Sequence, residues 1–169
     1  MIREILLSPE IVKPLHSLKL ISGHFLVSYS RKNGICIVDE DGDVLRSFVE
    51  ENVSWLGPTE LVCLTVDSSG SIMAADKTAG RVLLLTPTLE LKKELITQVH
   101  GLKSPVKIHL DESDGIRLLV ADDGLKSGVH TCIFEFGKSI HALREQSGLT
   151  RIIIPLYSSN SNMKLIRAV

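Results

Sequence analysis

Residues 70–76 are Gly70-Ser71-Ile72-Met73-Ala74-Ala75-Asp76, and residues 81–85 are Arg81-Val82-Leu83-Leu84-Leu85. The same order of turn, apolar strand and second apolar strand recurs in residues 23–38 and 117–134. Gly23 lies 47 residues before Gly70, and Asp122 lies 46 residues after Asp76. A repeat of about 40 to 50 residues carried by short strands is typical of propeller blades. The sequence therefore predicts an all-β fold, a partial β-propeller.

Each repeat is expected to form one four-stranded antiparallel blade, because short turns separate its apolar runs. In the middle repeat the expected strands are residues 61–67, 71–75, 81–86 and 89–96. In the third repeat, residues 106–110 form the inner strand, the second strand ends at Asp122, and residues 123–128 form a longer loop. The first repeat has its inner strand near residues 16–21 and its outer strand at residues 44–48.

The amino terminus is similar to the end of a blade. Residues 3–6 are predicted to be the outer strand of a blade whose other strands are missing, so the chain starts in mid-blade. The 169 residues cover fewer than about four repeats, whereas closed propellers have about four to eight blades. The unpaired flanks of an incomplete ring predict self-association.

The repeats end near residue 136, which divides the chain into blades at 1–136 and a basic tail at 137–169. The tail holds 5 Lys or Arg and 1 Asp or Glu, against 14 and 19 before it. Its sequence predicts a short helix at residues 140–146 and an edge strand at 150–155, or alternatively a partly disordered tail. Residues 163–166 are a further possible strand.

Bulk composition indicates a compact domain without a membrane span. The chain is 44% hydrophobic, and its net charge of -1 exerts no general attraction for nucleic acid or anionic lipid. No apolar run reaches the roughly 20 residues that cross a bilayer. The three cysteines lie in apolar strands at wide spacings, which predicts buried, reduced thiols: Cys36, Cys63 and Cys132. We therefore expect a reducing, cytoplasmic location.

The repeat resembles the NHL family of β-propellers. The pattern that carries the resemblance is Leu64-Thr65-Val66-Asp67-x-x-Gly70-x-Ile72-x-Ala74-Ala75-Asp76-x-x-x-Gly80-Arg81-Val82-x-x-Leu85, and its third copy runs from Pro105 to Asp122. The first copy departs from the pattern, because Tyr29 stands where the family has Asp. The resemblance implies a binding platform. In tripartite-motif ubiquitin ligases, such propellers form the carboxy-terminal domain and recruit protein or RNA.

The acidic residues at strand ends have two readings. Asp76 and Asp122 end second strands, and Asp67 and Asp111 end inner strands. Each can be a metal ligand or general base, but Asp commonly accepts backbone N–H groups in the turn that follows, and this structural role is favoured. No histidine pair or serine motif points to catalysis. We expect no catalytic residues, no bound metal and no cofactor.

The best binding candidates follow the second strands, because equivalent loops of a propeller gather on one face. Their basic residues are Arg31, Lys32, Lys77, Arg81 and Lys126. We expect a non-enzymatic module that binds a protein partner there. RNA recognition by the same cations is the alternative, which an aromatic content of 4% disfavours. A lactonase- or lyase-type propeller is the third reading, with Glu60 as the one acid that begins an inner strand.

Overall fold

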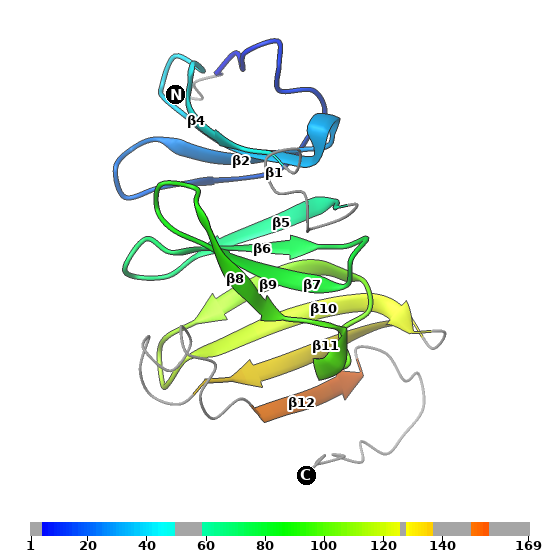
Figure 1. The fold of residues 1–169 in the computed structure, drawn as a ribbon. Coiled ribbons are helices and arrows are strands. Elements are labelled where there is room, and N and C mark those ends of the chain that lie inside the picture. Colours follow the sequence, from blue (N-terminus) through cyan, green and yellow to red (C-terminus); the bar gives the residue numbers. More distant parts are fainter. Residues whose placement is uncertain (1–4, 50–58, 126–127, 137–149, 156–169) are drawn as a thin grey trace.

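The computed structural model describes residues 5–49, 59–125, 128–136 and 150–155, which form three four-stranded antiparallel sheets (Figure 1). Each sheet is one blade. Blade 1 contains β1 (Pro14–Lys19), β2 (Phe25–Tyr29), β3 (Gly34–Val38) and β4 (Val44–Phe48). Blade 2 contains β5 (Leu61–Val66), β6 (Ile72–Asp76), β7 (Arg81–Leu85) and β8 (Leu91–Ile96). Blade 3 contains β9 (Pro105–Asp111), β10 (Arg117–Leu125), β11 (Gly128–Glu135) and β12 (Thr150–Pro155).

A glycine turn joins the first two strands of every blade. The three turn glycines have φ angles of 92°, 85° and 100°, a region that L residues with a Cβ rarely adopt: Gly23, Gly70 and Gly115. In blade 2 the turn is also held by Asp67, whose carboxylate accepts the backbone N–H groups of Ser69 and Ser71 at 2.9 and 2.7 Å. The repeated sequence therefore produces the same reversal of the chain in each blade.

Both flanks of blade 2 are buried. Every residue of β6 and β7 is buried. Ile72 and Leu83 belong to the core shared with blade 1, whereas Met73 and Leu84 belong to the core shared with blade 3. Because successive side chains of a strand point to opposite faces of a sheet, one apolar run supplies both interfaces.

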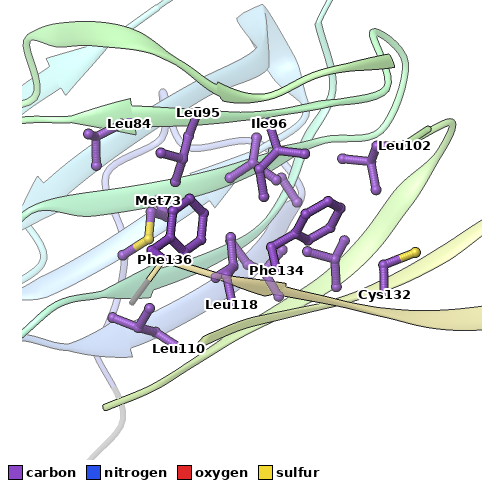
Figure 2. Packing of buried hydrophobic residues seen from close by; sticks show 14 of the residues in the cluster. Met73, Leu84, Leu95, Ile96, Leu102, Leu110, Leu118, Cys132, Phe134 and Phe136 are labelled. Atoms are coloured by element: carbon purple, nitrogen blue, oxygen red, sulfur yellow. The ribbon is translucent and has the colours of Figure 1, made fainter. Parts of the chain in front are cut away.

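The core between blades 2 and 3 is centred on two phenylalanines without exposed surface, Phe134 and Phe136. Figure 2 shows their rings among side chains contributed by both blades and by the connecting segment, including Met73, Leu95 and Leu118. Burying a side chain of this size stabilises the fold by about 1.5–3 kcal/mol. This core holds the two sheets together.

The inner strands β1, β5 and β9 pack next to one another, and the sheets are stacked in the order of the sequence (Figure 1). Four-stranded sheets that meet along their innermost strands are the blades of a propeller. The predicted fold class, a partial β-propeller of four-stranded antiparallel blades, is therefore confirmed.

The second and third strands of blade 3 are longer than predicted. β10 continues to Leu125 and β11 begins at Gly128, so the prediction of a loop over residues 123–128 is wrong. The pairing of these strands shifts register between Asp122 and Leu125. Such an irregularity lets a strand bend and then continue its ladder beyond a polar segment.

The strand predicted at residues 150–155 is confirmed as β12. It pairs with β11 in antiparallel register, from Glu135 opposite Thr150 to His130 opposite Pro155. Part of the segment 137–169 is thus the outer strand of blade 3. The predicted helix at residues 140–146 and the possible strand at 163–166 lie outside the described residues.

Residues 7–13 cover the outer flank of blade 1. Leu7 and Ile11 from this segment pack against apolar side chains of that flank, namely Val27, Tyr29, Cys36 and Val38. The backbone N–H of Ser8 donates to the carbonyl oxygen of Gly42 at 3.2 Å. One flank that the repeat pattern leaves unpaired is therefore covered by the chain itself, and the predicted self-association stays a prediction.

The prediction of an outer strand at residues 3–6 is wrong for residues 5 and 6, which are the part of this range that the structure describes. Ile5 and Leu6 are not in a strand. The chain turns at Pro9, where the N–H of Ile11 donates to the carbonyl oxygen of Ser8 at 2.9 Å. The segment contributes apolar side chains to a sheet flank instead of adding a strand to a sheet edge.

We predict that Gly42→Ala destabilises the protein by at least about 1 kcal/mol more than Gly23→Ala. Both glycines have nearly the same positive φ, 91° and 92°, so both variants bear a similar backbone cost of roughly 1–2 kcal/mol. A Cβ on Gly42 would lie 2.0 Å from the carbonyl oxygen of Leu6, whereas a Cβ on Gly23 would meet no atom within 4 Å. Urea denaturation measures both losses, and equal values would contradict the close packing of the amino-terminal segment.

Candidate functional site

Antiparallel strands place the polar loops and turns of the blades at two opposite faces. We define the turn face as the one that carries the turns between first and second strands, and the loop face as the one that carries the loops after second strands. On the turn face, Ser68 of blade 2 donates its N–H and hydroxyl to the carboxylate of Glu112 in blade 3, at 3.1 and 3.0 Å. On the loop face, Lys77 and Asp123 form an ion pair at 3.9 Å. Equivalent segments of adjacent blades therefore gather, as predicted.

Arg81 does not contribute to an exposed cationic patch, which corrects the prediction. Its side chain is 8% exposed. The guanidinium donates from Nε to Asp76 at 2.8 Å and from Nη1 to the carboxylate of Glu94. Arg81, the first residue of β7, is therefore buried within blade 2, and the carboxylates of Asp76 and Glu94 neutralise its charge.

Two of the other predicted cations, Lys32 and Lys77, lie on the described part of the loop face. Lys32 is exposed, in the 3-10 turn η1 (Arg31–Asn33), with a left-handed φ of 64°. Lys77 is partly exposed and faces Asp123. The side chain of Arg31 and all of Lys126 lie outside the described residues. In the described part of the loop face, Lys32 and Lys77 are thus the predicted cations that reach the surface.

Asp76 and Asp122 are fully buried, and they hold the entry of the chain into blades 2 and 3. Asp76 accepts the backbone N–H of Glu60 at 3.0 Å and that of Ala79 at 3.2 Å. Asp122 accepts three backbone N–H groups, at 2.9, 2.7 and 3.0 Å, from Lys103, Ser104 and Gly124. The structural role favoured from the sequence is confirmed for both residues.

The remaining acidic candidates also serve turns. Asp111 accepts the N–H and hydroxyl of Ser113 at 3.0 and 2.6 Å and pairs with Arg117 at 2.8 Å, and these hydrogen bonds keep its pKa below the usual value. Among the described residues, no group of three or more His, Cys, Asp and Glu is placed to hold a metal ion.

The three cysteines are buried and form no disulfide, as predicted: Cys36, Cys63 and Cys132. Burial, with the nearby charge of Glu10, raises the pKa of Cys36 to about 12. Such a thiol stays protonated and packs as a small apolar side chain. In the described segments no helix has the length and apolarity that crossing a membrane requires.

An open apolar hollow of about 700 Å³ lies on the turn face between blades 1 and 2, and we call it the interblade groove. Its walls come from β1, from the segment after it, and from the facing turns of blade 2, and they include Leu18, Leu20, Val66, Ile72 and Pro87. Two large apolar side chains stand exposed at its rim, Ile21 at 96% and Leu45 at 47%. A hollow of this size and composition is typical of binding sites.

Around the interblade groove the basic side chains are exposed, whereas the acidic side chains are already hydrogen-bonded. Lys19 and Arg46 from blade 1 are exposed at the groove, with Lys19 Nζ 5.8 Å from the centre of the Phe25 ring. The acids at the groove already have partners, since Asp67 binds its own turn and Glu112 binds Ser68. The groove therefore combines apolar walls with a cationic side.

Sequence reasoning missed the interblade groove, although one signal was present. Leu20 and Ile21 are adjacent apolar residues in the turn that leads to Gly23, and the corresponding residues of blade 2 are Asp67 and Ser68. An apolar turn in place of a polar one marks a surface that excludes water. The matching wall on blade 2 could not be seen in the sequence.

A second cavity, of about 570 Å³, lies along the inner strands, and we call it the inner-edge cavity. Its lining includes His16 of β1 together with Lys107 and His109 of β9. The Nδ1 atom of His16 accepts the backbone N–H of Leu64 at 3.3 Å. Partial burial, and then the charge of Lys107, lower the pKa of His16 below 6.5.

No protein-family model and no curated protein matches the chain. Solved structures do resemble it. A catalytically inactive virginiamycin B lyase from Staphylococcus aureus with quinupristin has a TM-score of 0.63 at 14% identity, over 93% of this chain and 46% of that one. BBS1N in complex with ARL6DN gives 0.53 at 18% identity, over 86% and 40%. YCF48 from Cyanidioschyzon merolae gives 0.51 at 16% identity, over 97% and 45%.

These neighbours are propeller-type proteins, and the chain spans less than half the length of each. Their low identity shows a common fold and leaves activity undetermined. The predicted propeller is therefore supported, whereas the narrower NHL resemblance is not singled out by these comparisons.

We predict that Asp122→Ala lowers the free energy of unfolding by at least about 2 kcal/mol, because three backbone donors at a buried site would lose their acceptor. The exposed Asp114 is the control, and Asp114→Ala should change stability by no more than about 0.5 kcal/mol. Urea denaturation of both variants makes the comparison. Similar values for the two would argue against the role of Asp122 in holding the blade entry.

We also predict that His16 titrates below 6.5 in the folded protein. Because its pKa is depressed relative to the unfolded chain, His16 contributes stability that is present above pH 6.5 and is lost as pH falls through the folded pKa. Proton NMR of the ring gives the midpoint. Lys107→Met should raise this midpoint by removing a nearby positive charge, and Lys92→Met on β8 should leave it unchanged. A midpoint at or above 6.5 would contradict the partly buried, neutral ring.

Proposed function

We propose that this protein is a non-enzymatic binding module that recruits a protein partner by holding a segment of it in the interblade groove. The observation that carries the proposal is the apolar hollow of about 700 Å³ beside exposed Lys19 and Arg46. Apolar side chains such as Ile21, which is 96% exposed, are costly to leave in water unless a partner covers them.

The chemistry of the groove favours a particular kind of segment. The apolar walls suit one or two large aliphatic or aromatic side chains, which dominate binding energy at most interfaces. Lys19 and Arg46 suit carboxylates beside that anchor, since complementary charge speeds association and selects partners. The expected ligand is therefore an exposed acidic segment that carries an apolar anchor.

A protein partner is favoured over RNA. Nucleic-acid binding needs several free cations along a phosphate path, whereas Arg81 is buried in ion pairs and Lys77 faces Asp123. The complex of BBS1N with ARL6DN is an example of a similarly folded protein that holds a protein partner. The burial of the three cysteines without a disulfide agrees with action in the cytoplasm.

The cellular setting of this recruitment is proposed from the repeat pattern alone. The likeness of Leu64–Leu85 to NHL repeats suggests substrate recruitment for a ubiquitin ligase of the tripartite-motif type. In that setting the ligase substrate would be the partner bound in the interblade groove, and the chemistry of the groove would be the same.

We predict that Ile21→Glu abolishes peptide recognition while the fold is retained, because this side chain is almost fully exposed. A library of short random peptides would be screened for binding to the wild-type protein. The enriched sequences should combine apolar and acidic residues. Their affinity, measured by fluorescence anisotropy, should fall at least about tenfold, or about 1.4 kcal/mol, in Ile21→Glu.

The matched control is Val99→Glu. Val99 is 89% exposed, and it lies in the 3-10 turn η3 (Gln98–His100), which joins β8 to β9 on the loop face. Peptide affinity should stay within about twofold in this variant. Failure to enrich any peptide, or equal weakening by both substitutions, would overturn the assignment of the groove.

A further inference from the structure

The inner-edge cavity is separate from the interblade groove and is formed where the inner strands of all three blades meet. Its lining combines residues of β1, β5 and β9 with residues of β10 and β11 in blade 3. The apolar part of this lining includes Leu15, Val62, Ile108, Leu119 and Ala121. A volume of about 570 Å³ lies in the range of small-molecule sites.

The charged part of the lining is entirely basic or imidazole. Lys107 and His109 are two residues apart on β9, so both lie on the same face of blade 3. Their cross-strand neighbours on β10 are Ala121 and Leu119, which supply no carboxylate. None of the residues that line the cavity is acidic, and in the described part of the chain Lys107 has no ion pair.

His16 completes the polar side of the cavity as a hydrogen-bond donor. A histidine nitrogen that accepts an N–H carries no proton of its own, so the bond from Leu64 to Nδ1 puts the ring proton on Nε2. The lowered pKa of His16 agrees with this neutral ring. The hydroxyl of Thr131 also lines the cavity.

We infer that the inner-edge cavity binds a small organic anion, with a carboxylate or similar acidic head beside Lys107 and an apolar body along the surrounding aliphatic side chains. A cation is disfavoured because the lining holds an ammonium group and no acid. An inorganic anion would leave the apolar walls unused, and a neutral apolar molecule would not use the charge of Lys107, whose side chain is exposed at the cavity. This inference is independent of partner recruitment by the interblade groove.

The charge contribution can be measured with octanoate, which has a carboxylate head and an aliphatic body. Calorimetric titration of the full chain should detect octanoate binding with a stoichiometry of about one molecule per chain. Lys107→Met should weaken it at least about tenfold, as expected when a hydrogen bond to a charged group is lost. The control Lys92→Met removes an exposed charge from the outer strand β8 and should leave the affinity unchanged.

Two further probes distinguish the parts of the ligand. Octylamine, with the opposite charge, and inorganic phosphate, without an apolar body, should each bind at least about tenfold more weakly than octanoate. Octanoate should also raise the pKa of His16 in the NMR titration, because a nearby negative charge favours the protonated ring.

The inference is overturned if octanoate does not bind, or if it binds Lys107→Met as tightly as the wild type. Tighter binding of phosphate or octylamine than of octanoate would overturn the ligand class. Ile21→Glu serves as a second control, since it alters the groove and should leave octanoate affinity unchanged. Loss of peptide binding with retained octanoate binding would separate the two sites.

Discussion

The mutual burial of blade flanks is the constraint on which this structure depends. A single four-stranded sheet of this composition has two apolar faces, and water would contact both if it stood alone. Blade 2 resolves the problem by packing one face on blade 1 and the other on blade 3. The flank of blade 1 that faces away is covered by Leu7 and Ile11. Mutual burial of flanks therefore sets the order of the sheets and the position of the amino-terminal segment.

Stacked blades bring residues distant in sequence to common surfaces, and this produces both candidate sites. Buried Asp76 and Asp122 bind the chain as it enters the inner strands of blades 2 and 3, so each of these two blades starts at a defined place. The turns then align from blade to blade, and the interblade groove forms where an apolar turn of blade 1 faces blade 2. The inner-edge cavity forms at the meeting of the inner strands. Neither site belongs to one repeat alone.

The functional residues differ from those that a repeat pattern highlights. Asp76 and Asp122, which recur with the repeat, accept backbone N–H groups and are buried. Arg81 belongs to the motif of the middle repeat alone, and its charge is neutralised by Asp76 and Glu94. The groove instead uses Ile21, Leu45, Lys19 and Arg46, which no repeat conserves. Repeated polar residues in this chain thus maintain the blades, and irregular residues supply the surfaces.

The sequence alone determined the three repeats, most of their strands and the glycine turns between first and second strands, because local apolar runs and turn residues control these features. It also indicated the structural use of Asp76 and Asp122, whose position before a turn limits what a short carboxylate can reach. Only the tertiary structure decided that residues 7–13 cover a flank, that Arg81 is buried, and where the two cavities lie. Each of these features depends on contacts between segments far apart in the chain. The linear pattern of a segment does not show which sheet flank or which charged residue will pack against that segment.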